Sequence, residues 1–141
     1  MTPEAEIWEA LHTHLRSVFE RDPDTYRATT TEDLSLYEWF ISPHRQDGLS
    51  FHLFMIEHGA MLGNAASYRY DLLTPRLQVY ADAAIVTYTL MLSVVAEGTV
   101  SHRTHNESRV LVREDGSWRV VHVHKSPAWQ APLSAPEGPG L

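Results

Sequence analysis

The stretch NESRVLVREDGSWRVVHVHK at residues 106–125 contains the clearest indication of the fold. Apolar and polar residues alternate on both sides of Asp115-Gly116, a dipeptide that favours the two-residue turn of a β-hairpin. The pattern therefore predicts antiparallel strands at 106–113 and 117–125. If the turn has two residues, the numbers of directly opposed residues add up to 231.

This register places four polar side chains on one face of the hairpin. Arg109 lies opposite His122. Glu107 lies opposite His124, and all four share a face because side chains two residues apart on a strand point the same way. The other face is apolar and carries Val110, Val112, Val121 and Val123. Because exposure of such an apolar surface to water is unfavourable, we expect a second copy of the chain to cover it, in a homodimer or higher oligomer.

Three interpretations of the four polar groups remain open. They can form a structural network of ion pairs that adds little net stability. They can instead line a pocket in which Arg109 holds an anionic or carbonyl oxygen while a histidine or Glu107 transfers a proton. His122 and His124 could also bind zinc or iron, but the fixed charge of Arg109 disfavours this, and we expect neither a metal nor a cofactor.

Strands are also predicted upstream of the hairpin. Apolar residues recur with a period of two at 68–73 and 77–80, and a longer run follows at 84–95. One face of the longer run should point into the core. It carries Val86, Tyr88, Leu90, Leu92 and Val94.

Three helices are expected before these strands. The first begins at Thr2-Pro3, has apolar residues three and four apart, and ends near Arg21. A short helix through Tyr26 and an extended stretch at 34–40 follow, then a turn at Ser42-Pro43 and a third helix at 50–62. Helices followed by a mainly antiparallel sheet define an α+β fold. Residues 1–127 would form one domain, and the proline-rich segment 128–141 a flexible tail.

Composition excludes several classes of protein. A net charge of −7 argues against nucleic-acid binding, which relies on clustered Lys and Arg. The absence of cysteine excludes disulfides and thiolate sites. We find neither a signal peptide nor an apolar run of about 20 residues, so we expect a cytoplasmic protein without a membrane partner. Phosphate loops, Gly-x-Ser-x-Gly elbows and His-Glu-x-x-His helices are also absent.

Further histidines and aromatic residues are candidates outside the hairpin. His52 lies on a helical stripe and could point into the same cavity, although a single histidine there is more often a core residue. His102 and His105, placed in a linker, should be exposed to solvent. Trp8 and Trp118 are expected in the core, and the run YEWF at 37–40 at the sheet edge or the cavity mouth.

The segments at 106–127 (NESRVLVREDGSWRVVHVHKSP), 75–91 (PRLQVYADAAIVTYTLM) and 47–59 (DGLSFHLFMIEHG) resemble the association (hub) domain of calcium/calmodulin-dependent protein kinase II. That family belongs to the nuclear transport factor 2-like superfamily, which includes ketosteroid isomerases and polyketide cyclases. The resemblance implies a cone, in which N-terminal helices pack on a strongly curved, mainly antiparallel sheet. A chain of 141 residues holds no kinase domain, so kinase regulation is not implied.

In that family the convex sheet face builds dimers and rings, and a deep pocket of arginines and a histidine can hold a small carboxylate. The resemblance implies ligand contacts from His52, Arg109, Lys125, Glu107, His122 and His124. Lys125 stands where arginine is common. Leu90 stands where the middle strand usually has an arginine, which makes this pocket less basic.

The leading hypothesis is a homo-oligomeric, stand-alone association-domain-like protein whose internal pocket binds a small polar or acidic ligand. The alternative is a SnoaL-like or ketosteroid isomerase-like lyase, isomerase or cyclase. In that enzyme Glu107, His122 or His124 would perform acid–base chemistry on a carbonyl compound.

Overall fold

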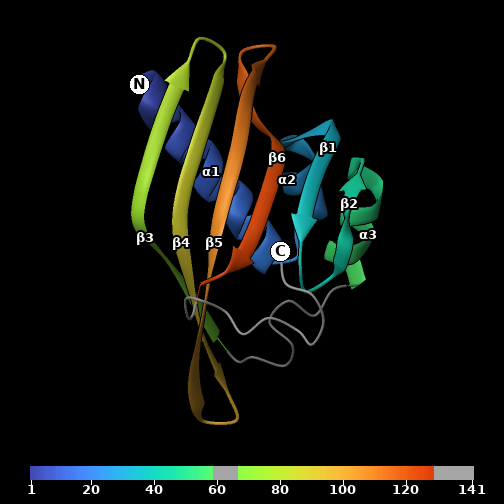
Figure 1. Cartoon of the computed structure of the whole chain (residues 1–141), viewed down its shortest axis with the longest axis vertical. Coiled ribbons are helices and arrows are strands. Elements are labelled where there is room, and N and C mark those ends of the chain that lie inside the picture. Colours follow the sequence, from blue (N-terminus) through green and yellow to red (C-terminus); the bar gives the residue numbers. More distant parts are fainter. Residues whose placement is uncertain (59–66, 129–141) are drawn as a thin grey trace, which may run out of the picture.

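Helices precede and then cover a single sheet in the computed structural model, which describes residues 1–58 and 67–128 (Figure 1). The elements, in order, are α1 (Pro3–Phe19), α2 (Pro23–Ala28), β1 (Thr30–Glu38), β2 (Ser42–Asp47), α3 (Leu49–His58), β3 (Ser67–Tyr80), β4 (Ala83–Ala96), β5 (Thr99–Glu114) and β6 (Ser117–Pro127). The six strands lie in the order β2-β1-β6-β5-β4-β3, and only β1 and β6 are parallel within the described chain. The predicted α+β class is confirmed.

Helix α1 forms where the sequence predicted it. The Thr2 side chain accepts a hydrogen bond from the backbone N–H of Ala5 at 3.1 Å, and Pro3 occupies the first helical position. The helix ends at Phe19, two residues before the predicted Arg21, which has a positive φ of 55°. The helix crosses behind the strands in Figure 1, and one of its faces is buried.

Strand β4 shows the predicted alternation. Val86, Tyr88, Leu90 and Leu92 are buried, and Val94 is partly buried against the same core. The two predicted strands before it form a single strand, β3, with an irregularity between Leu73 and Arg76. The β4 side chains that face the helices therefore form the floor of the interior.

Other boundaries differ from the predictions. Strand β5 begins at Thr99 instead of residue 106, so β4 and β5 form a long hairpin whose tip projects from the body (Figure 1). The turn predicted at Ser42-Pro43 is wrong, because these residues open β2, an edge strand where proline is tolerated. Helix α3 is described to His58, and the rest of the predicted helix lies outside the described residues. The same holds for 129–141 of the predicted tail, so the domain boundary stays a prediction.

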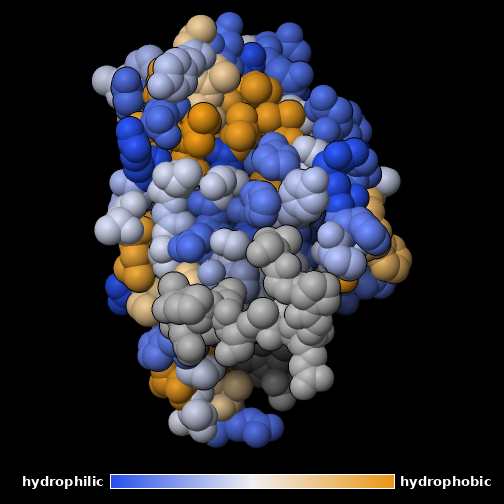
Figure 2. All heavy atoms as spheres, viewed as in Figure 1, coloured by the Kyte–Doolittle hydropathy of each residue, from blue (hydrophilic) through white to orange (hydrophobic). Residues whose placement is uncertain are grey.

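The outer face of the sheet points away from the helices. Because the even-numbered residues of β4 are buried, Ile85 and its neighbours at odd positions point outward, and Ile85 pairs with Val110 of β5. Apolar side chains gather on this face near the β3–β4 and β5–β6 turns (Figure 2). No helix in the described ranges is long and apolar enough to cross a membrane.

Candidate functional site

A one-residue bulge in β6 decides which side chains reach the interior. The predicted pairing holds from Glu114 and Ser117 up to Leu111 and Val120, and then Val110 pairs with His122. Val121 is the additional residue, and a bulge of this kind reverses the side-chain alternation of the strand. The predicted pairing of Arg109 with His122 and of Glu107 with His124 is therefore wrong.

After the bulge, Val123 and Lys125 point into the interior. Val123 pairs with Arg109, and Lys125 pairs with Glu107. The parallel neighbour of Lys125 on β1 is Glu38, and the antiparallel neighbour of Glu107 on β4 is Tyr88. A polar row therefore crosses four strands in the order Glu38, Lys125, Glu107, Tyr88.

This row faces a cavity of about 570 Å³ between the sheet and the helices. Its charged lining includes Glu38, Glu107, Arg109 and Lys125, and its apolar lining comes from α1, α3 and the segment after β1. The volume is in the range of sites that hold small organic molecules, about 300–1,000 Å³.

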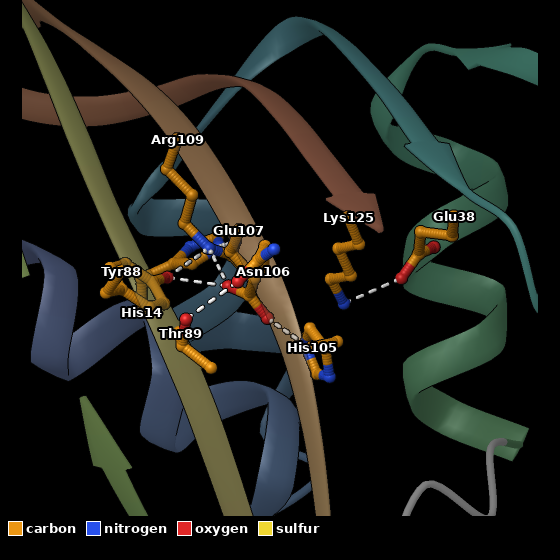
Figure 3. A network of polar contacts seen from close by, with 9 residues as sticks. All are labelled: His14, Glu38, Tyr88, Thr89, His105, Asn106, Glu107, Arg109 and Lys125. Atoms are coloured by element: carbon orange, nitrogen blue, oxygen red, sulfur yellow. Dashed lines mark hydrogen bonds and ion pairs between the residues drawn. The ribbon is translucent and has the colours of Figure 1, made fainter. Parts of the chain in front are cut away.

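Arg109 and Glu107 form the first buried cluster (Figure 3). The Nε of Arg109 donates to Glu107 Oε1 at 2.9 Å and to the hydroxyl of Tyr88 at 3.0 Å, and this hydroxyl donates to Glu107 Oε1 at 2.6 Å. Burial alone would raise the pKa of Glu107, but Arg109 and His105 outweigh it and hold that pKa well below its usual range. Burial and the carboxylate of Glu107 raise the pKa of Tyr88 well above 10.

His14 of α1 holds the guanidinium from the helix side. Burial, followed by the charge of Arg109, keeps the pKa of His14 well below 6.5, so the ring is neutral. Its Nε2 lies 2.9 Å from Arg109 Nη1 and must accept, because the guanidinium can only donate. Its Nδ1 then donates to the hydroxyl of Thr29 at 3.0 Å. Arg109 Nη2 makes no hydrogen bond with any described residue.

Lys125, Glu38 and His52 form the second cluster. Lys125 Nζ donates to Glu38 Oε2 at 2.8 Å, and only 4% and 2% of these side chains are exposed. His52 Nε2 lies 3.3 Å from Glu38 Oε1, without the alignment of a hydrogen bond. Burial would raise the pKa of Glu38, but Lys125 and then His52 lower it to about 2. The ring of Tyr26 packs against His52 at 5.0 Å between centroids.

His105 belongs to the site, although the sequence placed it in an exposed linker. It lies on β5, where its Nε2 is 2.5 Å from Glu107 Oε2, and 16% of its side chain is exposed. Trp39, just after β1, contacts the imidazole edge-on at 5.8 Å. Phe40 lies 5.6 Å from the ammonium of Lys125. The prediction that the 37–40 segment borders the cavity is thus confirmed for Trp39 and Phe40.

Comparison with known proteins identifies this arrangement. Residues 3–129 match the family described as the calcium/calmodulin dependent protein kinase II association domain. The chain belongs to this family. It is 27% identical over 124 residues to the calcium/calmodulin-dependent protein kinase type II of Caenorhabditis briggsae. The aligned region covers 86% of this chain but only 22% of the kinase. The chain thus spans about a fifth of that relative.

Solved structures agree with this assignment. The CaMKII hub of S. rosetta is 27% identical, with a TM-score of 0.79 over 91% of this chain and 98% of the hub. A nuclear transport factor 2-like superfamily protein of Salmonella enterica has a TM-score of 0.75 and 24% identity, covering 95% of both chains. The second match shows the fold alone, and confirms the cone that the resemblance implied.

Two predicted site residues of this association domain lie away from its cavity. His122 and His124 leave the outer face of β6, where His122 Nδ1 lies 2.8 Å from Ser35 Oγ and the ring of Tyr37 lies 5.0 Å from that of His124. Burial and the neighbouring His124 lower the pKa of His122. Within the described residues, no three His, Asp or Glu side chains are placed to hold a metal ion.

The association domain brings the other four predicted residues together. His52, Arg109, Lys125 and Glu107 all line the cavity. Sequence reasoning missed their partners Glu38, His14 and His105. Two of these had a readable signal, because Glu38 continues the buried alternation of Leu34 and Leu36, and His14 lies in the apolar stripe of α1.

Proposed function

We propose that this association domain assembles with copies of itself and binds a small organic acid in its internal cavity. The observation that carries the binding proposal is the convergence of Arg109 and Lys125, both almost fully buried, on one cavity of about 570 Å³. Buried cations beside an apolar wall suit a carboxylate with an apolar body.

Family membership and the outer face support self-assembly. The family is described as an association domain, and a solved relative is described as a CaMKII hub, names that fit a self-assembling domain. Ile85, Val110 and Val112 are half-buried on the outer face, where a second copy would remove them from water.

Assembly is tested by light scattering coupled to size-exclusion chromatography. We expect a mass of at least two chains at micromolar concentration. The variant Val110→Lys should lower that mass, because a charge in an apolar interface is costly, whereas Val100→Lys at the exposed hairpin tip should not change it. A wild-type monomer would contradict self-assembly.

Ligand binding is tested with phenylacetate, its neutral analogue phenylacetamide, and acetate. Phenylacetate should bind more tightly than either, because only phenylacetate offers both a carboxylate and a ring for the apolar wall. The paired variant Glu38→Gln/Lys125→Met removes one cation without leaving its partner charged. This double variant should lower the affinity for phenylacetate by about tenfold or more. Saturable binding of phenylacetamide but not of phenylacetate would refute an acid-binding pocket.

The enzymatic alternative receives less support from the same contacts. His122 and His124 point away from the cavity, which leaves Glu107 as the proposed acid or base. Both oxygens of Glu107 already accept hydrogen bonds, and its pKa is held well below its usual range, so it is a poor proton acceptor near neutral pH. We therefore propose binding in preference to acid–base catalysis by these residues.

A further inference from the structure

The two buried carboxylates of the cavity have the same kind of surroundings. Glu107 lies between Arg109, at 2.9 Å, and His105, at 2.5 Å. Glu38 lies between Lys125, at 2.8 Å, and His52, at 3.3 Å. Each carboxylate thus has one permanent cation on one side and one imidazole on the other, and all six groups line one cavity.

The charges of these six groups depend on the two imidazoles. Arg109 and Lys125 cancel Glu107 and Glu38, so the set is neutral while both imidazoles are neutral. Protonation of His105 adds one positive charge beside Arg109, and protonation of His52 adds one beside Lys125. An anion that enters the neutral set would meet two carboxylates as well as two cations. It would be bound more strongly if an imidazole were charged.

Several other groups face the two imidazoles. His52 of α3 packs on Tyr26 of α2, and the neutral His14 of α1 contacts the same ring of Tyr26 at 4.6 Å. Lys125 of β6 acts on Glu38 and also on Glu107, which favours the ionised carboxylates beside both imidazoles.

The surroundings of His105 complete this description. Trp39 contacts its ring from the segment after β1. Arg21, after α1, and Arg103, on β5, also line the cavity as permanent cations. Neither changes its charge near neutral pH. His102 of β5 is a third imidazole of the lining; it is exposed to solvent, and its Nδ1 lies 2.7 Å from the hydroxyl oxygen of Ser93.

We propose that the cavity binds an organic anion together with a proton, and that His105 and His52 take up that proton. This inference rests on the proposed acid-binding function. The proton comes from solvent, reaches one imidazole nitrogen and leaves when the anion leaves, so no bond in the ligand changes. His52 Nδ1 is buried without a partner among the described residues, and the imidazolium ring would offer two donors where the neutral ring offers one.

The sign of the pH dependence follows from linkage. A bound anion favours the charged form of a neighbouring imidazole and so holds its proton to higher pH. The gain in anion affinity from the charged imidazole is complete at low pH, where the imidazole is protonated even in the empty cavity. The gain decreases as pH rises. None is left once the imidazole is neutral in the occupied cavity as well. Between these limits, uptake of one full proton makes affinity fall about tenfold for each pH unit.

The experiment measures phenylacetate binding by calorimetry from about pH 5.5 to 8.5, a range that brackets the ordinary imidazole value near 6.5. The ligand stays ionised throughout, since carboxylic acids have pKa values near 4. Slightly above neutral pH, where both phosphate and Tris buffer, titrations in the two differ in heat only if protons are exchanged with the buffer. We expect proton uptake, with affinity that falls as pH rises, and no such trend for phenylacetamide.

Glutamine variants show which histidine takes up the proton. His105→Gln and His52→Gln each keep an N–H donor for the neighbouring carboxylate but cannot take up a proton. Each single variant should reduce proton uptake, and the double variant should make phenylacetate affinity independent of pH. His44→Gln, at an exposed position of β2 outside the cavity lining, is the matched control and should behave as wild type.

The possible outcomes separate the two proposals. Phenylacetate binding that is independent of pH, with equal heats in both buffers, overturns proton coupling and leaves the acid-binding function intact. A double variant that keeps the wild-type pH dependence overturns the assignment to these two histidines. No phenylacetate binding to folded protein at any pH overturns both proposals. The two-buffer comparison needs only wild-type protein, so it decides the question even if a variant misfolds.

Discussion

Removing one partner of the Lys125–Glu38 pair should destabilise the fold far more than removing both. In Lys125→Met, Glu38 keeps a buried charge and loses the ammonium that lies 2.8 Å away. In Glu38→Gln, Lys125 keeps its charge and loses its hydrogen-bonded carboxylate. The double variant removes both charges and puts side chains of similar volume in their places.

Two independent routes give the size of the effect. Breaking a buried ion pair by removing one partner costs about 3–5 kcal/mol of unfolding free energy, and replacing both partners is often nearly neutral. The pKa of Glu38 is lowered from 4.5 to about 2. At about 1.4 kcal/mol for each pKa unit, this corresponds to about 3 kcal/mol of stabilisation of the ionised carboxylate.

Urea denaturation at pH 7 and one fixed protein concentration measures the three variants against wild type. We expect each single variant to lose about 3 kcal/mol or more, with Lys125→Met losing the most because Lys125 also neighbours Glu107. The double variant should lie within about 1 kcal/mol of wild type. Additive losses in the double variant would refute the reasoning, since they would mean that the two residues stabilise the fold separately.

The same pair predicts a dependence on pH. A carboxylate with a lowered folded-state pKa stabilises the fold above its unfolded pKa, and this contribution disappears as pH falls through the folded pKa. For Glu38 the window runs from about 4.5 to about 2. Between pH 5 and pH 3, wild type should therefore lose about 2 kcal/mol more than Glu38→Gln. Parallel pH profiles would contradict the lowered pKa.

Four further substitutions test the packing and the first helix cap. Leu111→Ala, at a fully buried position, should cost about 2–5 kcal/mol in urea denaturation. Thr2→Ala removes the cap on the N–H of Ala5 and should cost about 1 kcal/mol, seen as a lower Tm. Val123→Thr buries a hydroxyl and should cost about 1–3 kcal/mol, whereas Val121→Thr at the half-exposed bulge should stay within about 0.5 kcal/mol. Equal costs at 121 and 123 would speak against the bulge.

The general fold could be predicted because local signals agreed with each other. The alternation of β4 and the apolar stripe of α1 each indicate one buried face, and Asp115-Gly116 forms the predicted hairpin turn, with both residues at positive φ. Such signals depend only on spacing along the chain.

Elements that depend on distant partners could not be predicted in this way. The segment from Thr99 to His105 has little apolar alternation and is a strand because β4 pairs with it along its whole length. Strand β2 is polar and contains a proline, and it forms as an edge strand beside β1. In both cases tertiary pairing outweighs local preference.

The bulge at Val121 explains why Lys125 reaches the cavity whereas His122 and His124 do not. If β6 paired with β5 without a bulge, His124 would lie opposite Glu107, in the row of side chains that leads to Glu38. An imidazole, which carries no permanent charge, would then lie between two buried carboxylates, which repel each other unless a cation lies between them. The additional residue moves Lys125 into that position, so the row has alternating charge, and both carboxylates can stay ionised at almost complete burial. The consecutive apolar residues Val120 and Val121 fit either register. The requirement for a cation between Glu38 and Glu107 becomes visible only once β1 is placed beside β6.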